Sequence, residues 1–244
     1  MKGGVLHRQC AAQRDPGVCV AEQADRRTDA TRQQILRAAA RQFAIKPYGL
    51  VNLDDILSDA AVTKGAMYHH FRSKYALASA LVDQWLESTL RTVDETVALR
   101  RSAMETLVDL AFGTAVDDIG EHVTRAGLNL LESVGRTDGL RRRAFDTSRA
   151  ALVPLARRAV EEGDAADHTP PEDVARLLVF LYLGVRQASD LDDAAAFLGD
   201  LERAWALVLP GLAATERLGY LRTFVRRRSA LAIKKARPLS TDTL

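Results

Sequence analysis

Residues 52–74 constrain the fold of this chain more than any other segment. Asn52 is a favoured helix N-cap, and Asp54 and Asp55 occupy the first turn after it, where the helix dipole stabilises acidic side chains. Thr63 can cap a second helix after the tight turn formed by residues 60–62. Apolar residues recur at helical spacing before that turn, namely Leu53, Ile56, Leu57 and Ala60. The pattern predicts two short helices joined by a tight turn.

The second of these helices has two different sides. The inner side carries Ala66, Met67, His70 and Phe71, and the outer side carries Lys64, Gly65, Tyr68 and His69. A small, basic and ring-bearing outer side suits a helix that lies in the DNA major groove. Gly65 costs about 1 kcal/mol of helix propensity relative to alanine, but it permits close approach of a partner to the backbone. The alternative is a helical hairpin whose outer side is merely solvated.

A third helix is expected to begin at Ser73. Lys74 would then lie in its first turn, where a cation opposes the helix dipole, and a nearby DNA phosphate would explain that placement. We therefore expect these residues to contact DNA: Asn52, Thr63, Lys64, Gly65, Ala66, Tyr68, His69, His70 and Lys74. Gly65 and Ala66 would approach base edges, Lys64 would reach guanine or phosphate, and Tyr68, His69 and Lys74 would bind phosphates.

Residues 31–74 resemble the DNA-binding domain of TetR-family transcriptional regulators. The resemblance is carried by residues 31–43, Tyr48, the pair Leu53 and Ile56, and residues 62–74 with the run Thr-Lys-Gly-Ala-Met-Tyr-His-His-Phe. Within that family, residues 62–71, 124–131, 201–205 and 210–212 are most similar to the γ-butyrolactone autoregulator receptors of actinobacteria. Ala61 replaces the glycine usual in the turn, so a left-handed backbone there would carry a steric cost.

This resemblance implies an all-α homodimer, with an N-terminal three-helix DNA-binding domain containing a helix-turn-helix and a larger helical ligand-binding and dimerisation domain. We expect an irregular arm over residues 1–26, the DNA-binding domain over 27–74, the larger domain over 75–236 and a tail over 237–244. The first helix is expected over about residues 29–44, and a long helix from Ser73 to about Leu99 would link the two domains.

Composition and charge agree with this division. Period-two runs of β-branched residues are almost absent, which favours an all-α body. The net charge is +2, but it is divided into +5 for residues 1–74, −9 for residues 75–215 and +6 for residues 216–244. A basic N-terminal part on an acidic body suits a protein that meets a polyanion at one end. A ligand-independent architectural DNA-binding protein, by contrast, would carry basic patches throughout.

The chain has two cysteines, Cys10 and Cys19, which favour free thiols in a reducing cytosol over one local disulfide. No segment has the roughly 18 consecutive apolar residues of a membrane span, and residues 1–21 do not read as a signal peptide. We therefore expect a cytoplasmic protein without a membrane-spanning segment.

Two helices near the C-terminus, over residues 171–189 and 193–212, are apolar on more than one side. Such helices are buried on more than one side, so one side can face the core and the other a second copy of the chain in a four-helix, two-fold interface. The alternative is a central helix pair of a monomer.

A small-molecule effector requires a mostly apolar pocket with a few polar groups. Trp85 is the strongest candidate for its wall, because it lies on the helix linked to the DNA-binding domain. Further candidates are Leu128, Leu131, Phe145, Ser148 and Tyr182, and Asn129 and Gln187 can supply hydrogen bonds. Packing in the core is the alternative for the first group, and a surface position for the last two. By resemblance, Ser148 stands where several butyrolactone receptors have a pocket tryptophan.

An enzyme is the competing class of protein. The sequence lacks the GxSxG, P-loop, GxGxxG and HExxH motifs. We therefore expect no catalytic residues, no metal ligands and no cofactor. The expected partners are double-stranded operator DNA, a small-molecule effector of butyrolactone, butenolide or furan type, and a second copy of the chain. The alternative effector is an antibiotic or a biosynthetic intermediate.

Overall fold

The computed structural model describes residues 16–239, with side chains from residue 28 onward. Within this range the chain forms ten α-helices and two short 3-10 helices. Their bounds are α1 (Pro16–Ile45), η1 (Tyr48–Leu50), α2 (Leu53–Asp59), α3 (Lys64–His70), α4 (Lys74–Ala98), α5 (Ala103–Gly120), α6 (His122–Ser133), η2 (Thr137–Gly139), α7 (Leu140–Glu161), α8 (Pro171–Ala188), α9 (Ala194–Leu212) and α10 (Thr215–Lys235). The predicted all-α class is confirmed.

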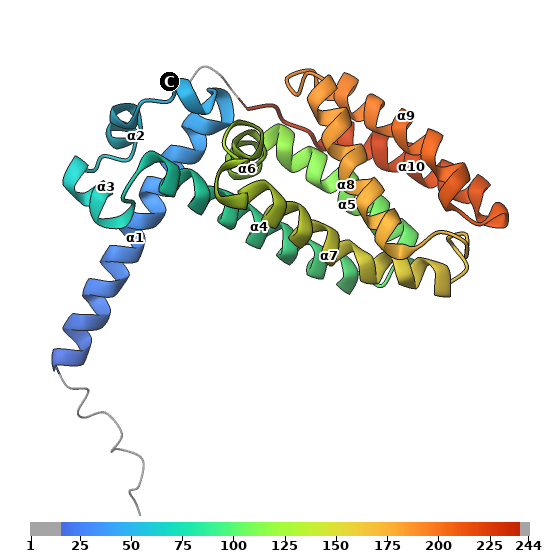
Figure 1. Cartoon of the computed structure of the whole chain (residues 1–244), viewed down its shortest axis with the longest axis horizontal. Helices are drawn as coiled ribbons and strands as arrows, with labels where there is room; N and C mark the ends of the chain where they lie inside the picture. Colours follow the sequence, from blue (N-terminus) through green and yellow to red (C-terminus); the bar gives the residue numbers. More distant parts are fainter. Residues whose placement is uncertain (1–15, 240–244) are drawn as a thin grey trace, which may run out of the picture.

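Helices α1 to α3 form a head at one end of the molecule, as Figure 1 shows. The expected inward stripe of α1 is buried, because Ile35, Leu36, Ala39 and Phe43 expose at most 1% of their surface. Fully buried Ile56 of α2 and Met67 of α3 belong to the same core cluster. The spacing of apolar residues at three and four positions thus produces the packing that it predicts.

Helix α1 begins earlier than the sequence analysis expected. The backbone of residues 16–26 is helical, where an irregular arm was expected. Pro16 suits a first helical turn, and no later proline interrupts the helix before its end at Ile45. Figure 1 shows the first part of α1 projecting away from the head. Residues 1–15 and the side chain of Cys19 lie outside the described part, and so does the expectation about the two cysteines.

Helix α4 runs from the head into the body, which consists of α5 to α10 (Figure 1). It packs along α6 and α7 as well as α1. At the crossing with α6, a Cβ atom on Gly127 would lie 2.6 Å from Cβ of Trp85. Because real Cβ atoms do not approach so closely, the glycine is required for α6 to lie against α4 at this point.

Helix α5 lies inside the body, where it contacts α6, α7, α9 and α10. Arg186 of α8 reaches Asp118 of α5, with Nε 2.6 Å from Oδ2, and the two side chains are 3% and 0% exposed. A buried ion pair of this kind fixes the position of one helix against the other, because neither charge has water to replace its partner.

The outer surface of α8 and α9 carries large apolar side chains. Phe180 is 54% exposed and Leu207 is 82% exposed, and Leu177 is also exposed. The expectation that these helices are apolar on more than one side is therefore confirmed, with one side left uncovered in a single chain. Among the described residues, no helix combines the length and the apolar character that crossing a membrane demands.

The turn between α2 and α3 supplies a test of backbone strain. Ala61 has a φ of 49°, the left-handed conformation that the sequence analysis associated with it. Its amide donates to the carbonyl of Ser58 and the next amide to that of Leu57, which ends α2. We expect Ala61→Gly to raise the free energy of unfolding by about 1 kcal/mol, because glycine adopts this conformation without a clash.

Urea unfolding at a fixed protein concentration measures this difference. Ala150→Gly, on an exposed position of α7, is the matched control and should lower stability by up to about 1 kcal/mol. Equal losses in both variants would show that the strain at Ala61 is absent.

The buried ion pair supplies a second prediction. Arg186→Met leaves the Asp118 carboxylate in the core without its partner, so we expect the free energy of unfolding to fall by about 3–5 kcal/mol. Arg142→Met is the control, since the Arg142 side chain is 90% exposed and its distance to Asp146 is 3.8 Å; this change should stay within about 0.5 kcal/mol. Chemical denaturation of both variants checks the contrast, and a similar small loss in each would contradict it.

Candidate nucleic-acid interface and ligand cavity

Three side-chain caps build the helix-turn-helix. Oδ1 of Asn52 accepts from the amide of Asp54 at 3.1 Å, and Oγ1 of Thr63 accepts from the amide of Ala66 at 3.2 Å. Oγ of Ser73 accepts from the amide of Ala76 at 3.0 Å and so begins α4. The capping residues were identified from the sequence because each satisfies an amide that the first helical turn leaves unpaired.

The outer side of α3 is open, as expected. Lys64, Gly65 and His69 are exposed, and Tyr68 is 43% exposed. A Cβ atom on Gly65 would meet nothing closer than Oγ1 of Thr63 at 4.0 Å. Internal packing therefore does not require glycine at this position, in contrast to Gly127. A residue that weakens the helix without serving its packing is consistent with close approach of an external partner.

Two of the predicted DNA contacts have neighbours inside the head. His70 is half-buried, and burial together with the charges of His69 and Arg32 lowers its pKa below the usual value. Nζ of Lys74 donates to the carbonyl of Val51 at 2.6 Å and lies 4.5 Å from the ring centre of Tyr48. Burial also lowers the pKa of Lys74. Lys74 thus fastens the start of α4 to the segment before α2, and its predicted phosphate contact stays a prediction.

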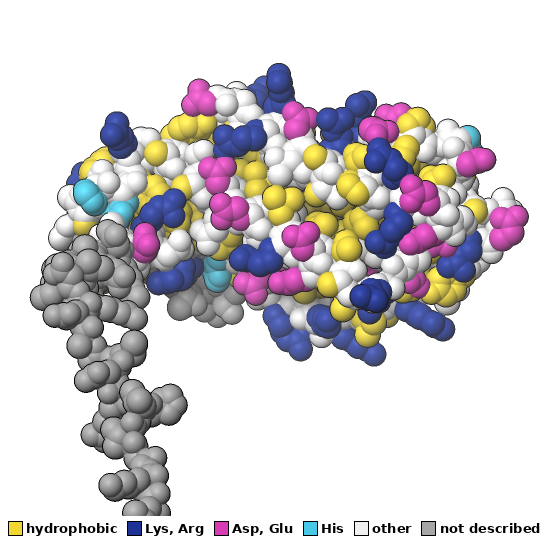
Figure 2. Space-filling view, turned by 90° about the horizontal axis from the view of Figure 1, so that it is seen from below, with side chains coloured by type: hydrophobic (Ala, Val, Ile, Leu, Met, Phe, Trp, Pro, Cys, Tyr) yellow, Lys and Arg dark blue, Asp and Glu magenta, His cyan; other side chains and the backbone are white. Residues whose placement is uncertain are grey.

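Charge is less segregated on the surface than along the sequence. Figure 2 shows acidic and basic side chains interspersed over the body, with hydrophobic side chains gathered between them. On the face that Figure 2 shows, the net charge of −9 for residues 75–215 does not appear as a continuous acidic surface. Exposed Arg72, between α3 and α4, is a basic residue of the head that the sequence analysis did not name as a contact.

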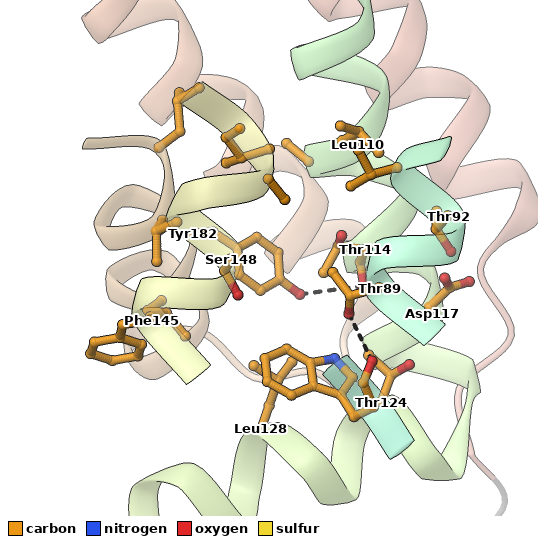
Figure 3. A pocket seen from close by; sticks show the side chains of 18 of the residues that line it. Thr89, Thr92, Leu110, Thr114, Asp117, Thr124, Leu128, Phe145, Ser148 and Tyr182 are labelled. Atoms are coloured by element: carbon orange, nitrogen blue, oxygen red, sulfur yellow. Dashed lines mark hydrogen bonds between the residues drawn. The ribbon is translucent and has the colours of Figure 1, made fainter. Parts of the chain in front are cut away.

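A cavity of about 120 Å³ lies within the body. All six ligand-binding candidates line it, although they come from four helices: Trp85 of α4, Leu128 and Leu131 of α6, Phe145 and Ser148 of α7, and Tyr182 of α8. Figure 3 shows Phe145, Ser148 and Tyr182 on one side and Thr89, Thr92 and Asp117 on the other. The six residues predicted from the sequence to bind a ligand therefore lie around one cavity.

The cavity contains hydrogen-bonding groups whose partners are missing. Nε1 of Trp85 and Nε1 of Trp205 are both buried and have no acceptor in the described part of the chain. A buried donor without a partner carries a desolvation cost, and each of these tryptophans lines the cavity. A molecule with a hydrogen-bond acceptor would remove that cost if it reached either indole.

Hydroxyl groups form the other polar part of the lining. Ser88, Thr89 and Thr92 follow Trp85 along α4, and Thr114 and Thr124 belong to α5 and α6. Burial, and next the charge of Glu121, raise the pKa of Asp117 at the same cavity. These residues were not predicted from the sequence. Serine and threonine at spacings of three and four from Trp85 were a usable signal, because such residues share a helix face.

Asn129 does not line this cavity. Its amide nitrogen donates to the carbonyls of Phe43 and Ala44, both at 3.1 Å. The proposal that it hydrogen-bonds a ligand is therefore wrong, because the side chain is directed from α6 toward α1. Within the described residues, no cluster of three or more histidine, cysteine or acidic side chains could hold a metal ion.

Comparison with known proteins gives the same picture of the head. A family described as "Bacterial regulatory proteins, tetR family" matches residues 35–81. The A-factor receptor protein of Streptomyces griseus is 30% identical over 185 residues, and the match covers 75% of this chain and 64% of that protein. The transcriptional regulator AcuR of Cereibacter sphaeroides is 30% identical over 152 residues, covering 57% of this chain and 67% of AcuR. This chain thus spans less than two thirds of the A-factor receptor.

Solved structures are similar over most of the chain. A gamma-butyrolactone receptor described as an ArpA-like protein is 27% identical with a TM-score of 0.70, and the match covers 84% of this chain and 99% of that one. CprB from Streptomyces coelicolor, in complex with its biological operator sequence, is 27% identical with a TM-score of 0.69 and the same two coverages.

Proposed function

Because the chain belongs to the tetR family of bacterial regulatory proteins, we propose that it is a ligand-released transcriptional repressor. In this proposal a homodimer binds a pseudo-palindromic operator in the cytoplasm and leaves it when a small molecule binds the body. The observation that carries the proposal is the open outer side of α3, where packing among the described residues does not require glycine at position 65. Similarity to a protein solved in complex with its operator sequence supports the proposed binding of operator DNA.

Each copy of α3 presents a short outer side to one half-site. Gly65 and Ala66 lie near base edges, where the methyl group of Ala66 can touch a thymine methyl. Lys64 reaches guanine or phosphate, while Tyr68 and His69 hold the protein on the backbone. The DNA therefore meets small residues at the centre of the contact and polar residues around it.

The second copy pairs through α8 and α9. Phe180 and Leu207 expose large apolar surfaces that a monomer would leave in water. Two copies of these helices form a four-helix interface about a two-fold axis. The two heads then present α3 to half-sites about 34–36 Å apart, one turn of DNA. Membership of the tetR family, for which the resemblance implies a homodimer, supports this assembly.

The effector is a butyrolactone-like, butenolide or furan molecule. The support is the similarity to proteins described as gamma-butyrolactone receptors and as an A-factor receptor, together with two unpartnered indole N–H groups that an ester or ketone oxygen can accept from. An antibiotic or biosynthetic intermediate is the second candidate, because Ser148 lines the cavity where, by resemblance, several butyrolactone receptors have a tryptophan. A ligand-independent architectural protein has no use for this cavity.

Selection of DNA from genomic fragments by the purified protein tests the proposal. We expect enrichment of a pseudo-palindrome and its release by culture extracts. Retention of fragments without a common sequence would instead support the architectural alternative, and no retention would remove the proposed function.

The phosphate contacts have their own test. Tyr68→Ala combined with Lys64→Ala should weaken operator binding by a similar factor for all sequences that retain the half-site. Loss of the Lys64 charge from a phosphate should reduce the salt slope by about 1, whereas loss of the uncharged Tyr68 hydroxyl lowers affinity without changing the slope. Tyr220→Ala combined with Lys234→Ala, at an exposed tyrosine and lysine of α10, is the matched control. Gel-shift titrations at several salt concentrations measure both pairs; equal effects would show that α3 is not the DNA contact.

The cavity has a separate test at Trp85. Trp85→Phe keeps an aromatic wall but removes the unpartnered N–H, so operator affinity should be unchanged. Half-maximal release should then require about fivefold more effector, since one hydrogen bond contributes about 1 kcal/mol. Phe224→Leu on α10 is the control. Release at an unchanged effector concentration would place the effector away from the Trp85 nitrogen.

A further inference from the structure

A chain of buried polar groups starts at the cavity wall. The hydroxyl of Tyr182, which lines the cavity, lies 3.0 Å from Oδ2 of Asp118 and 3.4 Å from the carbonyl of Thr114. Burial, followed by the Asp118 charge, raises the pKa of Tyr182 well above its usual value, so the phenol keeps its proton. Both neighbours are acceptors, so the hydroxyl is their donor. A ligand acceptor in the cavity competes for the same proton.

Arg186 of α8 connects this series of polar groups from α5 to α6. Its Nε and Nη2 donate to the two Asp118 oxygens at 2.6 and 3.2 Å. Nη2 also donates to Oδ1 of Asn129 at 2.7 Å, and Nη1 donates to Glu132 at 2.7 Å. A planar guanidinium with this many fixed partners moves as a unit. A shift of Asp118 is therefore transmitted to Asn129.

Asn129 is the last member of this series of hydrogen-bonded groups, and it contacts the head. Its Nδ2 donates to the carbonyls of Phe43 and Ala44, in the last turn of α1. The final carbonyls of a helix have no intrahelical donor, so Asn129 of α6 caps α1 from another helix. Its amide orientation is determined by its neighbours, because the guanidinium can only donate and the two carbonyls can only accept.

We propose that Asn129 is the positioning residue that couples the ligand cavity to the DNA-binding head. A molecule that takes the Tyr182 hydroxyl from Asp118 alters the hold of Arg186 on Asn129, and so alters the hold of Asn129 on α1. Helix α1 packs against both α2 and α3, so its movement reorients the recognition helix. The step from cavity to α1 stands on these contacts, and its use in operator release rests on the proposed function.

A purely structural cluster would behave differently. In that case Tyr182 would stabilise only α5 and α8, and Asn129 would stabilise only the contact between α6 and α1. The two residues would then act independently, since coupling between residues appears as non-additivity. The relevant measurement is whether a substitution at Tyr182 changes hydrogen exchange at the end of α1, and whether that change requires Asn129.

Asn129→Asp provides a selective break. It keeps an oxygen that accepts from Arg186, but it replaces the donor to the Phe43 and Ala44 carbonyls by a second acceptor. Tyr182→Phe removes only the hydroxyl. Tyr220→Phe is the matched control, because the Tyr220 hydroxyl is bonded to Glu105, outside this chain of groups.

Hydrogen exchange of the full-length protein, read by mass spectrometry on peptides covering residues 40–50, tests the coupling. Tyr182→Phe should accelerate exchange there by about two- to tenfold, the range of one hydrogen bond, and Tyr220→Phe should not. Asn129→Asp should accelerate it as much or more, and adding Tyr182→Phe to Asn129→Asp should have no further effect at these residues.

Two results would overturn the coupling. One is unchanged exchange over residues 40–50 in Tyr182→Phe, with changes confined to α5 and α8. The other is the same increment from Tyr182→Phe in the Asn129→Asp background. Operator binding by the unmodified protein is measured separately: if it binds no operator, the proposed function fails while the exchange result still decides the coupling.

Discussion

The arrangement of the body depends on the ion pair between Arg186 and Asp118. Both side chains are almost completely removed from water, so neither can lose the other without a large cost. Each helix that touches the pair acquires a defined place: α5 through Asp118, α8 through Arg186, and α6 through Asn129 and Glu132. The same pair connects Tyr182 at the cavity to Asn129 at the end of α1. A contact that stabilises the body is therefore also part of the proposed coupling between the cavity and the head.

Two glycines, Gly127 and Gly65, differ in whether packing requires them. The close crossing of α6 and α4 at Trp85 requires Gly127, whereas no contact among residues 28–239 requires Gly65. The first places a cavity wall against the helix that enters the head. The second leaves the backbone of α3 open to a partner. Glycine is thus required for packing at one site, and at the other it leaves backbone accessible for the proposed DNA contact.

Much of the fold and of the candidate site was predictable from local patterns. The caps Asn52, Thr63 and Ser73 and the apolar stripe of α1 follow from the residues themselves. The left-handed Ala61 was expected from the resemblance, which places a glycine at that position of the turn. The six cavity residues were named through resemblance and helix spacing, and the structure joins them. The surroundings of Asn129 and Lys74 were not predicted, because their partners, Phe43 and Val51, lie 86 and 23 positions away along the sequence.

The sequence by itself determined the helices, their caps, the turn before α3 and which residues of α3 face outward, because each depends on neighbours within a few positions. Only the tertiary structure decided that Tyr182, Asp118, Arg186 and Asn129 form one connected group, and that Lys74 is held by Val51. The physical reason is that hydrogen bonds and ion pairs between separate helices depend on crossing angles and distances, which residue spacing along one helix does not contain.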